Sequence, residues 1–354
     1  MILITKEFSC KSNYDFRKIG PLESLLFFDI ETTGLSAMTS SLYLIGCVYY
    51  KEERWHYTQW FSECMADEVE ILKQFFSFSK TFTHLIHFNG DGFDIPYVRN
   101  CCKQYNLDYN FNHLVSFDIY KRIKALKKLL ALENIKQKTL ERFLNTGRID
   151  PFTGKELIEL YKEYQKTKEK RLLDILLKHN EEDIIGLPNL LTLLSYEIKA
   201  DEIEDIHSNF FPNGTVALTI ERKCQVPVPI KRQWDNFNLA FHEKVFTLHI
   251  PLYEGELKFF YPNYKDYFYL PEEDMAIHKR VAEFVDKSHK KKATAATCYT
   301  KRQGLFLPQP HPIFEPVFYE SYKTGAYFEY TDEAFKEKEK AVAYIQTLIH
   351  SIGS

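Results

Sequence analysis

The sequence predicts an α/β domain, a mixed β-sheet flanked by helices, followed by a β-rich α+β domain. Residues 25–30 form an apolar run interrupted only by Asp29, as expected of a strand buried on both faces. From there, strand-like and helix-like segments alternate to about residue 198. Around residues 200–213 the chain becomes acidic and irregular, and it then continues in short alternating stretches separated by Pro and Gly.

The first domain is expected over residues 24–200, after an N-terminal extension of residues 1–23. Its strands are predicted by apolar or alternating runs and its helices by apolar residues at helical spacing. A four-residue polar connection after residue 50 indicates a hairpin, and Pro96 fits the first turn of a helix. The expected strands are 25–30, 43–50, 55–61, 82–88 and 115–120, and the expected helices of this part are 66–76 and 94–104.

The second domain is expected over residues 206–354. Alternating patterns predict strands that include residues 245–250 and 256–261, and helices are expected at about 272–286 and 332–351. The sequence contains no motif that assigns a role to this domain.

Composition excludes several classes of protein. Of the 354 residues, 45% are hydrophobic and 27% are charged, which is typical of a soluble globular chain. No apolar run approaches the roughly 18 residues that a membrane-spanning helix needs. Polar residues interrupt any signal-peptide core near the N-terminus, and the seven cysteines make no CxxC pair, so we expect free thiols in a reducing cytoplasm. The net charge of −3, with neither half strongly basic, argues against a non-specific duplex binder.

The first of three acidic segments lies at the end of the first expected strand. Asp29 and Glu31 are two residues apart, so their side chains project to the same side of the strand. A lone carboxylate in a buried strand is unfavourable unless a cation or hydrogen-bond donors compensate its charge. A metal site explains the pair, and a capping Asp beside an incidental Glu explains it equally well.

The other two segments lie at a loop and on a helix. In the first, a strand ends in a glycine-rich loop and Asp94 opens a helix, where the simplest interpretation of Asp94 alone is an N-cap. In the second, His179 and Asp183 lie four residues apart in a helical pattern and therefore share one helix face. Such a pair forms either a surface hydrogen bond or part of a ligand set.

Together the three segments resemble the motifs of the DEDD 3′–5′ exonucleases of the ribonuclease H-like superfamily. The motifs are Asp29-x-Glu31, Asn89-x-x-x-Phe93-Asp94 and His179-x-x-x-Asp183, and the match spans about residues 24–197. The second motif is especially similar to that of the proofreading domains of family B DNA polymerases. The chain as a whole is similar to bacterial ribonuclease H-like proteins of the YprB type. The resemblance implies a ribonuclease H-like sheet for the first domain.

The resemblance also implies two divalent cations, Mg²⁺ or Mn²⁺, held by four carboxylates. Asp29 would bridge the two ions, Glu31 and Asp183 would bind the first, and Asp94 would bind the second. Converging carboxylates repel one another unless cations compensate their charge, and Mg²⁺ prefers oxygen ligands. Two such ions stabilise both the attacking and the leaving oxygen of a phosphodiester.

His179 completes the catalytic set implied by the resemblance, as the group that takes a proton from the attacking water. Imidazole, with an ordinary pKa of about 6.5, suits this task at neutral pH. His179 lies four residues before Asp183, which is the spacing of the tyrosine subclass of these enzymes rather than of the histidine subclass. Residue type and spacing therefore come from different subclasses, which leaves the identity of the base open.

Substrate contacts follow from the same resemblance. Thr32, Thr33 and Leu35 would hold the 3′-terminal nucleotide by backbone contacts and an apolar wedge. Asn89 and Phe93 would meet the penultimate nucleotide, Phe93 by stacking on a base. Core packing explains Phe93 as well.

The sequence thus predicts a metal-dependent 3′–5′ exonuclease that acts on single-stranded DNA or RNA ends. A non-catalytic nucleic-acid-binding protein on the same fold, or an endonuclease, are the alternatives. The intact acidic motifs argue against the first alternative and His179 against the second. The stretch Lys121–Leu129 predicts a basic amphipathic helix, whose charged face is either simply solvated or, beside an active site, a track for phosphates.

Overall fold

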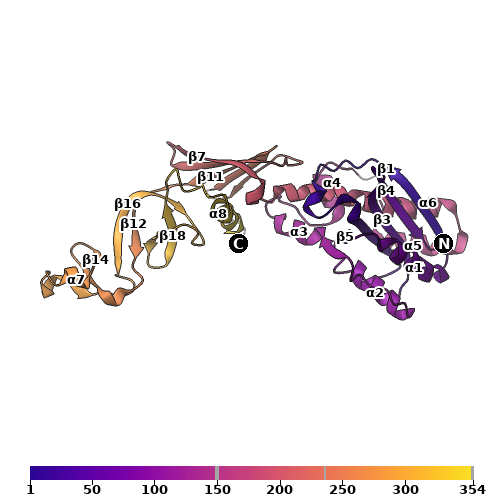
Figure 1. Cartoon of the computed structure of the whole chain (residues 1–354), viewed down its shortest axis with the longest axis horizontal. Coiled ribbons are helices and arrows are strands. Elements are labelled where there is room, and N and C mark those ends of the chain that lie inside the picture. The colour runs from indigo at the N-terminus through magenta and orange to yellow at the C-terminus, as the bar shows by residue number, and fades with distance from the viewer. Residues whose placement is uncertain (148–150, 235–236, 352–354) are drawn as a thin grey trace. The chain divides into compact units, whose positions relative to one another are not determined.

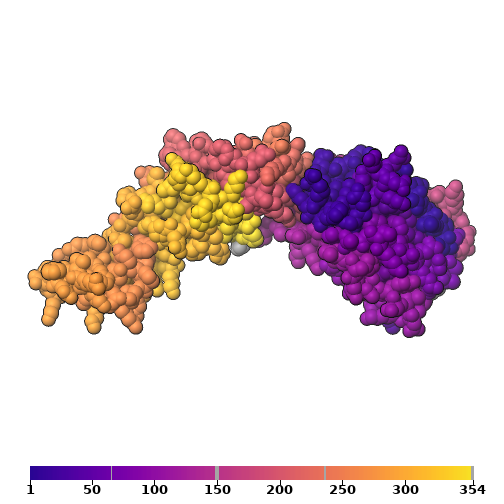
Figure 2. Space-filling view, viewed as in Figure 1, coloured from indigo at the N-terminus to yellow at the C-terminus, as the bar shows by residue number. Residues whose placement is uncertain are grey.

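The computed structural model describes residues 1–147, 151–234 and 237–351 and divides the chain into two units, Met1–Tyr196 and Glu197–Ser354. Figure 1 shows the elements of each unit, and Figure 2 shows the surface of each in the same colours along the chain. The division falls just before residue 200, where the sequence pattern changes.

A six-stranded mixed sheet forms the centre of the first unit, with the strand order β1-β4-β3-β2-β5-β6. The first four strands in this order pair antiparallel, whereas β2, β5 and β6 pair parallel. The carboxyl ends of β2, β5 and β6 therefore lie along one edge of the sheet. The strands are β1 (Ile2–Phe8), β2 (Leu25–Thr32), β3 (Leu42–Lys51), β4 (Arg54–Phe61), β5 (His84–His87) and β6 (Val115–Asp118).

The first strand, β1, belongs to this sheet, although we expected residues 1–23 to be an extension. It pairs with β4 from Ile2 opposite Phe61 to Phe8 opposite Trp55. As an edge strand it is mostly exposed, and it lies at the surface of its unit in Figure 2. A strand of this kind needs no continuous apolar run, which is why its sequence did not reveal it.

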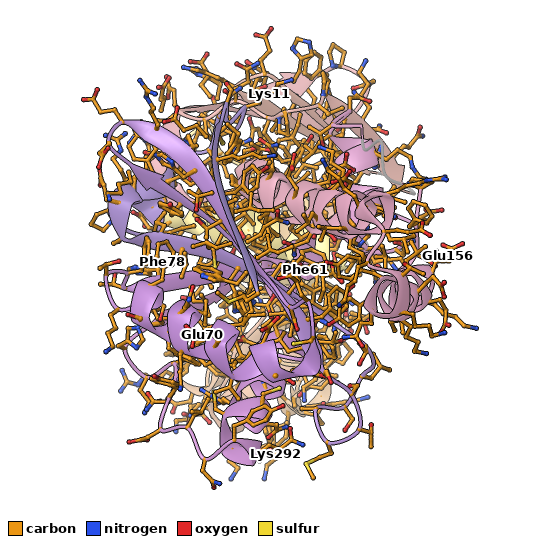
Figure 3. All side chains as sticks on the ribbon, turned by 90° about the vertical axis from the view of Figure 1, so that its right-hand side faces the viewer. Lys11, Phe61, Glu70, Phe78, Glu156 and Lys292 are labelled. Atoms are coloured by element: carbon orange, nitrogen blue, oxygen red, sulfur yellow. The ribbon has the colours of Figure 1, made fainter. Side chains whose placement is uncertain are left out.

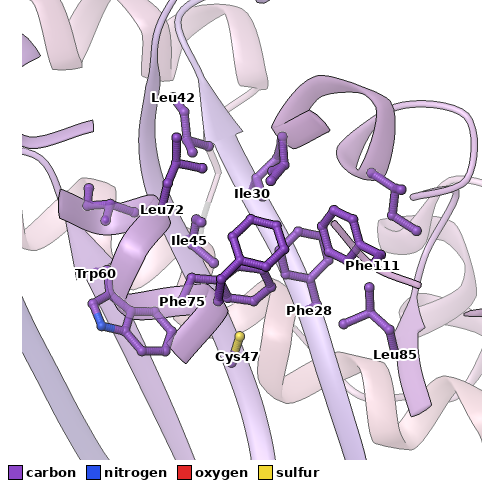
Figure 4. Close-up of a cluster of buried hydrophobic side chains, with 14 of the residues drawn as sticks. Phe28, Ile30, Leu42, Ile45, Cys47, Trp60, Leu72, Phe75, Leu85 and Phe111 are labelled. Carbon is purple, nitrogen blue, oxygen red and sulfur yellow. The ribbon is translucent and has the colours of Figure 1, made fainter. Parts of the chain in front are cut away.

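Helices cover both faces of the sheet. On one face, α1 and α2 pack on Phe28 and its neighbours; the rings of Phe28 and Phe75 lie 5.1 Å apart in the cluster of Figure 4. On the other face, α5 and α6 cover Tyr43 and Phe61, and Phe61 lies inside in Figure 3. The helices of the first unit are α1 (Glu68–Ser79), α2 (Asp94–Gln104), α3 (Ile119–Leu126), α4 (Gln137–Phe143), α5 (Gly154–Thr167) and α6 (Lys170–Leu190), with short 3₁₀ helices at Phe16–Lys18, Leu22–Ser24, Met65–Asp67 and Leu191–Tyr196. Across the described ranges, no helix has the length and apolarity needed to cross a membrane.

The second unit is β-rich, as predicted. A five-stranded antiparallel sheet has the order β7-β8-β11-β10-β9, four strands close into a barrel, and a small three-stranded sheet has the order β14-β13-β15. The sheet strands are β7 (Ile203–Phe211), β8 (Thr215–Arg222), β9 (Ile230–Trp234), β10 (Phe237–His242) and β11 (Val245–Pro251). The barrel strands are β12 (Tyr253–Phe260), β16 (Tyr299–Pro308), β17 (Val317–Ser321) and β18 (Thr324–Glu329). The remaining elements are β13 (Tyr267–Leu270), β14 (Met275–His278), β15 (Lys291–Lys292), α7 (Lys279–Ala282), α8 (Lys338–Ser351) and 3₁₀ helices at Ala200–Glu202, Tyr264–Asp266 and Lys287–His289.

Two helix predictions in this unit require correction. The helix expected at 272–286 is wrong for most of its length, because residues 275–278 form β14 and pair with β13, which leaves only the short helix α7. Pairing with the partner strand gives these residues their strand conformation, and their local sequence pattern does not predict it. The final helix begins at Lys338 rather than near residue 332.

We predict that the aromatic core beneath α1 dominates the stability of the first unit. Phe75 is fully buried among Phe28, Trp60, Phe76 and Phe111. Phe75→Ala should therefore lower the free energy of unfolding by about 3–5 kcal/mol. Leu35→Ala removes a side chain that is 89% exposed and should change it by less than about 0.5 kcal/mol. Denaturant unfolding followed by circular dichroism measures both values, and equal losses would contradict the prediction.

Candidate metal centre

The two acidic side chains of β2, Asp29 and Glu31, lie on the side of the sheet that α6 covers. Leu26, Phe28 and Ile30 belong to the core cluster on the α1 side of the sheet. Side chains alternate along a strand, so Asp29 and Glu31 project to the opposite face. The pairing of β2 with β3 becomes irregular after Glu31, which places both carboxyl groups near the carboxyl end of the strand.

Glu31 meets His179 and Asp183 of α6. His179 Nε2 lies 3.7 Å from Glu31 Oε1 and 3.1 Å from Asp183 Oδ2. One ligand atom from each of the three residues lies within 4.8 Å of the others, a spacing that suits a metal ion. The structure therefore brings together parts of the first and third sequence motifs, from segments almost 150 residues apart.

Asp29 is held by a buried amide that the sequence analysis did not assign. Asn180 Nδ2 donates to Asp29 Oδ2 at 3.0 Å, and Asn180 Oδ1 accepts from Gln59 Nε2 at 3.0 Å. Gly46 lies opposite Asp29 in β3, and a Cβ atom at Gly46 would lie 2.1 Å from Asn180 Oδ1. The glycine thus makes room for the amide that orients Asp29. The available signal was the position of Asn180 inside the third motif, next to His179.

Asp94 also lies beside β2. It is the first residue of α2, it is only 5% exposed, and its Oδ1 accepts a hydrogen bond from the backbone N–H of Ile30 at 3.2 Å. Phe93, not Asp94, occupies the N-cap position of α2. The side chain of Asp94 therefore joins the second motif to the strand between Asp29 and Glu31.

Burial makes these carboxyl groups difficult to ionise in the absence of a cation. Burial, together with repulsion from Asp183 and Asp94, raises the pKa of Glu31 to about 8, against the opposing effect of His179. Burial likewise raises the pKa of Asp94 to about 7, and the charge of Asp118 adds to this effect. A divalent cation would offset the cost of burying these charges and their mutual repulsion. A donor set dominated by carboxylate oxygens suits Mg²⁺ or Mn²⁺. The residues at this site fit such an ion.

The loop between β5 and α2 is tied to the ends of β5 and β6. Asp118 Oδ1 accepts from the backbone N–H of Asn89 at 2.9 Å, and His87 Nδ1 accepts from that of Gly90 at 3.0 Å. Burial lowers the pKa of His87, which favours the neutral ring that this acceptor role requires. A Cβ atom at Gly90 would lie 2.7 Å from the His87 ring, so the loop needs glycine there.

A hydrogen-bond chain continues from His87 across the same loop. His87 Nε2 lies 2.8 Å from Ser116 Oγ, which donates to Asp91 Oδ1 at 2.6 Å, and Lys121 pairs with the other oxygen of Asp91. Ligand atoms of His87, Asp91 and Asp118 also lie within 4.8 Å of one another. Because most of these atoms have protein partners and Lys121 supplies a positive charge, we interpret this cluster as a clamp on the loop rather than as a second ion site.

The predicted substrate residues occupy two places at the sheet edge. Leu35, just beyond β2, is 89% exposed and free to meet a ligand. Thr33 instead exchanges hydrogen bonds with Ser41 through its backbone N–H and its hydroxyl, and Thr32 Oγ1 donates to the carbonyl of Gly34. Both hydroxyl groups are therefore engaged within the loop.

Asn89 and Phe93 lie in the clamped loop. Asn89 has a positive φ of 62°, which gives this loop its tight turn. The Phe93 ring is partly buried against the core and lies 5.6 Å from the Tyr97 ring. The Phe93 ring thus contacts the core but is not fully enclosed by it. Its position is compatible with both expected roles, core packing and stacking on a base.

Comparison with known proteins agrees with this architecture. Residues 26–195 match the family described as the RNase_H superfamily. The first unit has a ribonuclease H-like fold. The predicted resemblance extends to the uncharacterized protein YprB of Bacillus subtilis (strain 168), which is 27% identical over 182 residues. That alignment covers 50% of this chain and 43% of YprB, so less than half of the relative's length is represented.

Two solved structures of nucleic-acid enzymes are also similar to this chain. The family B DNA polymerase of the archaeon Pyrobaculum calidifontis has 10% identity and a TM-score of 0.39, covering 66% of this chain and 33% of the polymerase. The zinc-bound ExoI–ssDNA complex of E. coli has 12% identity and a TM-score of 0.31, covering 57% of this chain and 55% of ExoI.

We predict that Gly46→Ala disrupts the support of Asp29. The added methyl group would overlap Asn180 Oδ1, so the amide and α6 must shift. Unfolding free energy should fall by about 1–3 kcal/mol, and Mn²⁺ affinity should fall by about tenfold or more. Gly154→Ala is the matched control, because nothing lies within 4 Å of its Cβ position. Calorimetric titration with Mn²⁺ and thermal unfolding measure both effects; a Gly46→Ala protein that behaves like the control would refute this role.

The raised pKa values predict an unusual pH dependence for the metal-free protein. The folded state holds a proton on Glu31 up to about pH 8, whereas the unfolded chain releases it near pH 4.5. Stability should therefore decrease by a few kcal/mol as pH rises between these values. A glutamine at this position cannot titrate, so the stability of the Glu31→Gln variant should fall less over the same pH range. Thermal unfolding in EDTA at pH 5 and pH 9 tests the difference, and equal pH responses of the two proteins would be the contrary result.

Proposed function

We propose that this chain is a metal-dependent 3′–5′ exonuclease that hydrolyses phosphodiester bonds at single-stranded ends of DNA or RNA. The proposal rests mainly on the meeting of Glu31, His179 and Asp183, with Asp29 and Asp94 held beside the same strand end. The ribonuclease H-like fold of the first unit supports it.

In this proposal the four carboxylates hold two divalent cations. Asp29 would contact both ions, as the resemblance implies, and Asn180 holds one of its oxygens from the α6 side. Glu31 and Asp183 would bind one ion, and Asp94, anchored on the Ile30 backbone, would bind the other. When bound, the ions would supply Lewis-acid stabilisation of the charge that develops on the phosphate oxygens.

His179 is the proposed acceptor of the proton from the attacking water. Its ring is buried, and Asp183 Oδ2 lies 3.1 Å from its Nε2. A carboxylate at this distance orients the imidazole and stabilises its protonated form. The i, i+4 spacing on α6 thus allows the ring to reach the carboxylate cluster, despite the difference from the usual histidine spacing.

The proposed attack at the 3′ end comes from the resemblance of the motifs, and two segments would supply the substrate contacts. Leu35 would act as the exposed apolar wedge against the terminal nucleotide, and Phe93 would stack on the next base. Backbone groups of the loop held by Asp118 and His87 would then fix the strand relative to Asp94.

One assay separates this proposal from its alternatives. The purified full chain is incubated with 3′-labelled and 5′-labelled DNA and RNA oligonucleotides in Mg²⁺, Mn²⁺ or EDTA. A 3′–5′ exonuclease releases mononucleotides first from the 3′ label and only with metal. Internal fragments would indicate an endonuclease, and binding without any cleavage would indicate a non-catalytic protein.

We predict that Asp29→Ala abolishes cleavage and tight Mn²⁺ binding together. One carboxylate is proposed to contact both ions, so its loss removes the whole centre. Asp174→Ala changes an exposed acid on the same helix as Asp183 and should leave both properties unchanged. If calorimetry shows Mn²⁺ binding to wild type and Asp29→Ala alike, the bridging assignment is wrong.

His179→Ala should separate proton transfer from metal binding. We expect nearly normal Mn²⁺ binding, because the four carboxylates are the proposed ligands, but a chemical step slower by roughly 10²–10⁴-fold, because the proposed proton acceptor is lost. The wild-type rate should rise with pH through the titration of the histidine, and this dependence should vanish in the variant. Single-turnover cleavage of a short 3′-labelled strand from pH 5.5 to 9 measures both. A loss below about fivefold would remove His179 from the catalytic set.

A further inference from the structure

Helix α3 and the turn after it carry a continuous basic face. Five cations and no acidic residue occur in eight positions, and all five side chains are exposed. Ile119, Ile123 and Leu126 form the buried side of α3. We call the five cations the basic face of α3; they are Lys121, Arg122, Lys124, Lys127 and Lys128.

Most of the charge on this face has no ion-pair partner within the described ranges. Lys121 pairs with Asp91, but within the described ranges Lys124, Lys127 and Lys128 have no ion-pair partner. Like charges three and four residues apart on a helix repel each other and weaken the helix. Packing explains the buried side of α3, and it leaves the concentration of charge on the other side without a structural role.

The start of α3, with the first cations of the basic face, lies at the sheet edge that also holds the candidate metal centre. Helix α3 begins directly after β6, and β6 runs parallel to β5 and β2. Figure 1 shows α3 beside β5 in the first unit. The ion pair of Lys121 with Asp91 fixes the start of α3 to the loop that carries Asp94. Asp91 lies only three residues before Asp94, so this ion pair keeps the start of α3 near the residue that opens α2.

We propose that the basic face of α3 binds the phosphodiester backbone of a single strand whose end occupies the candidate metal centre. This inference rests on the proposed nuclease function and adds to it a binding site remote from the chemistry. Single-strand-binding proteins commonly use a positive surface that follows the backbone, and each phosphate that a lysine neutralises releases counterions.

The composition of the face favours a nucleic acid over a membrane. A helix that binds a lipid surface needs large apolar side chains beside its lysines, whereas Ala125 is the one apolar residue exposed among positions 121–128. The position of α3 relative to the candidate centre also predicts a dependence on strand length. A strand that leaves the centre along the sheet edge would meet α3 after several nucleotides. The protein should therefore prefer strands long enough to reach α3 over fragments of two or three nucleotides.

Binding measured without cleavage tests this inference directly. The full chain in EDTA is titrated into fluorescein-labelled 20-nucleotide oligo-dT and oligo-rU, and anisotropy is followed at several salt concentrations. The triple variant Lys124→Gln, Lys127→Gln, Lys128→Gln should bind both strands at least tenfold more weakly at low salt. Loss of three phosphate contacts should also reduce the slope of log affinity against log salt by about 2.

A matched variant controls for net charge. Lys73→Gln, Lys80→Gln, Lys103→Gln removes three exposed lysines at α1 and α2, the helices that pack on the Phe28 side of the sheet. It should bind within about twofold of wild type. Replacing the three α3 lysines by arginine should retain binding. Equal losses in both Gln variants, no loss in either, or a wild-type chain that binds neither strand would overturn the proposal. The proposal would also be overturned if the α3 triple variant lost binding to phosphatidylserine vesicles but kept its binding to the oligonucleotides.

Kinetics with Mn²⁺ provide the readout for strand length. The α3 triple variant should raise KM for the 20-nucleotide strands without changing kcat, and it should leave cleavage of a trinucleotide unchanged. An equal effect on both lengths would overturn the inference. If no protein cleaves any strand, the proposed exonuclease function fails, while the contrast in binding still decides the role of α3.

Discussion

The burial of several carboxyl groups around one strand end constrains much of the first unit. Such groups repel one another, and burial raises the pKa of Glu31 and of Asp94. Each is therefore held by a specific contact: His179 lies beside Glu31, and the Ile30 backbone donates to Asp94. Asn180 reaches Asp29 only because residue 46 is glycine. The proposed binding of cations would offset the cost of this otherwise unfavourable arrangement.

The central strands and the motif residues could be predicted from the sequence because their signals are local. Apolar runs mark β2 to β5, and the spacing within each motif places its residues on one face. β1 and β14 were missed because their conformation depends on a partner strand. Asn180 and Gly46 escaped for a similar reason, since the closeness of α6 to β3 exists only in the folded chain.

The parallel part of the sheet explains how separate tasks share one edge. β2 ends at the carboxyl cluster, β5 ends at the loop held by His87, and β6 ends at Asp118. Helix α3 then continues from that last strand with its exposed lysines. The ends of three neighbouring strands thus carry the carboxyl cluster, the clamped loop and the start of the basic helix. Ligand sites in sheets of parallel strands commonly lie at the carboxyl ends of the strands.

The place of α6 in the chain has a consequence for biosynthesis. This helix is the last long element of its unit, and it supplies both His179 and Asp183. A nascent chain that has emerged only as far as β6 has made Asp29, Glu31 and Asp94, but it lacks the residues that complete the centre. Domains fold as units during synthesis, so assembly waits until nearly 190 residues are available. Prematurely terminated products would consequently lack the complete cluster of Glu31, His179 and Asp183.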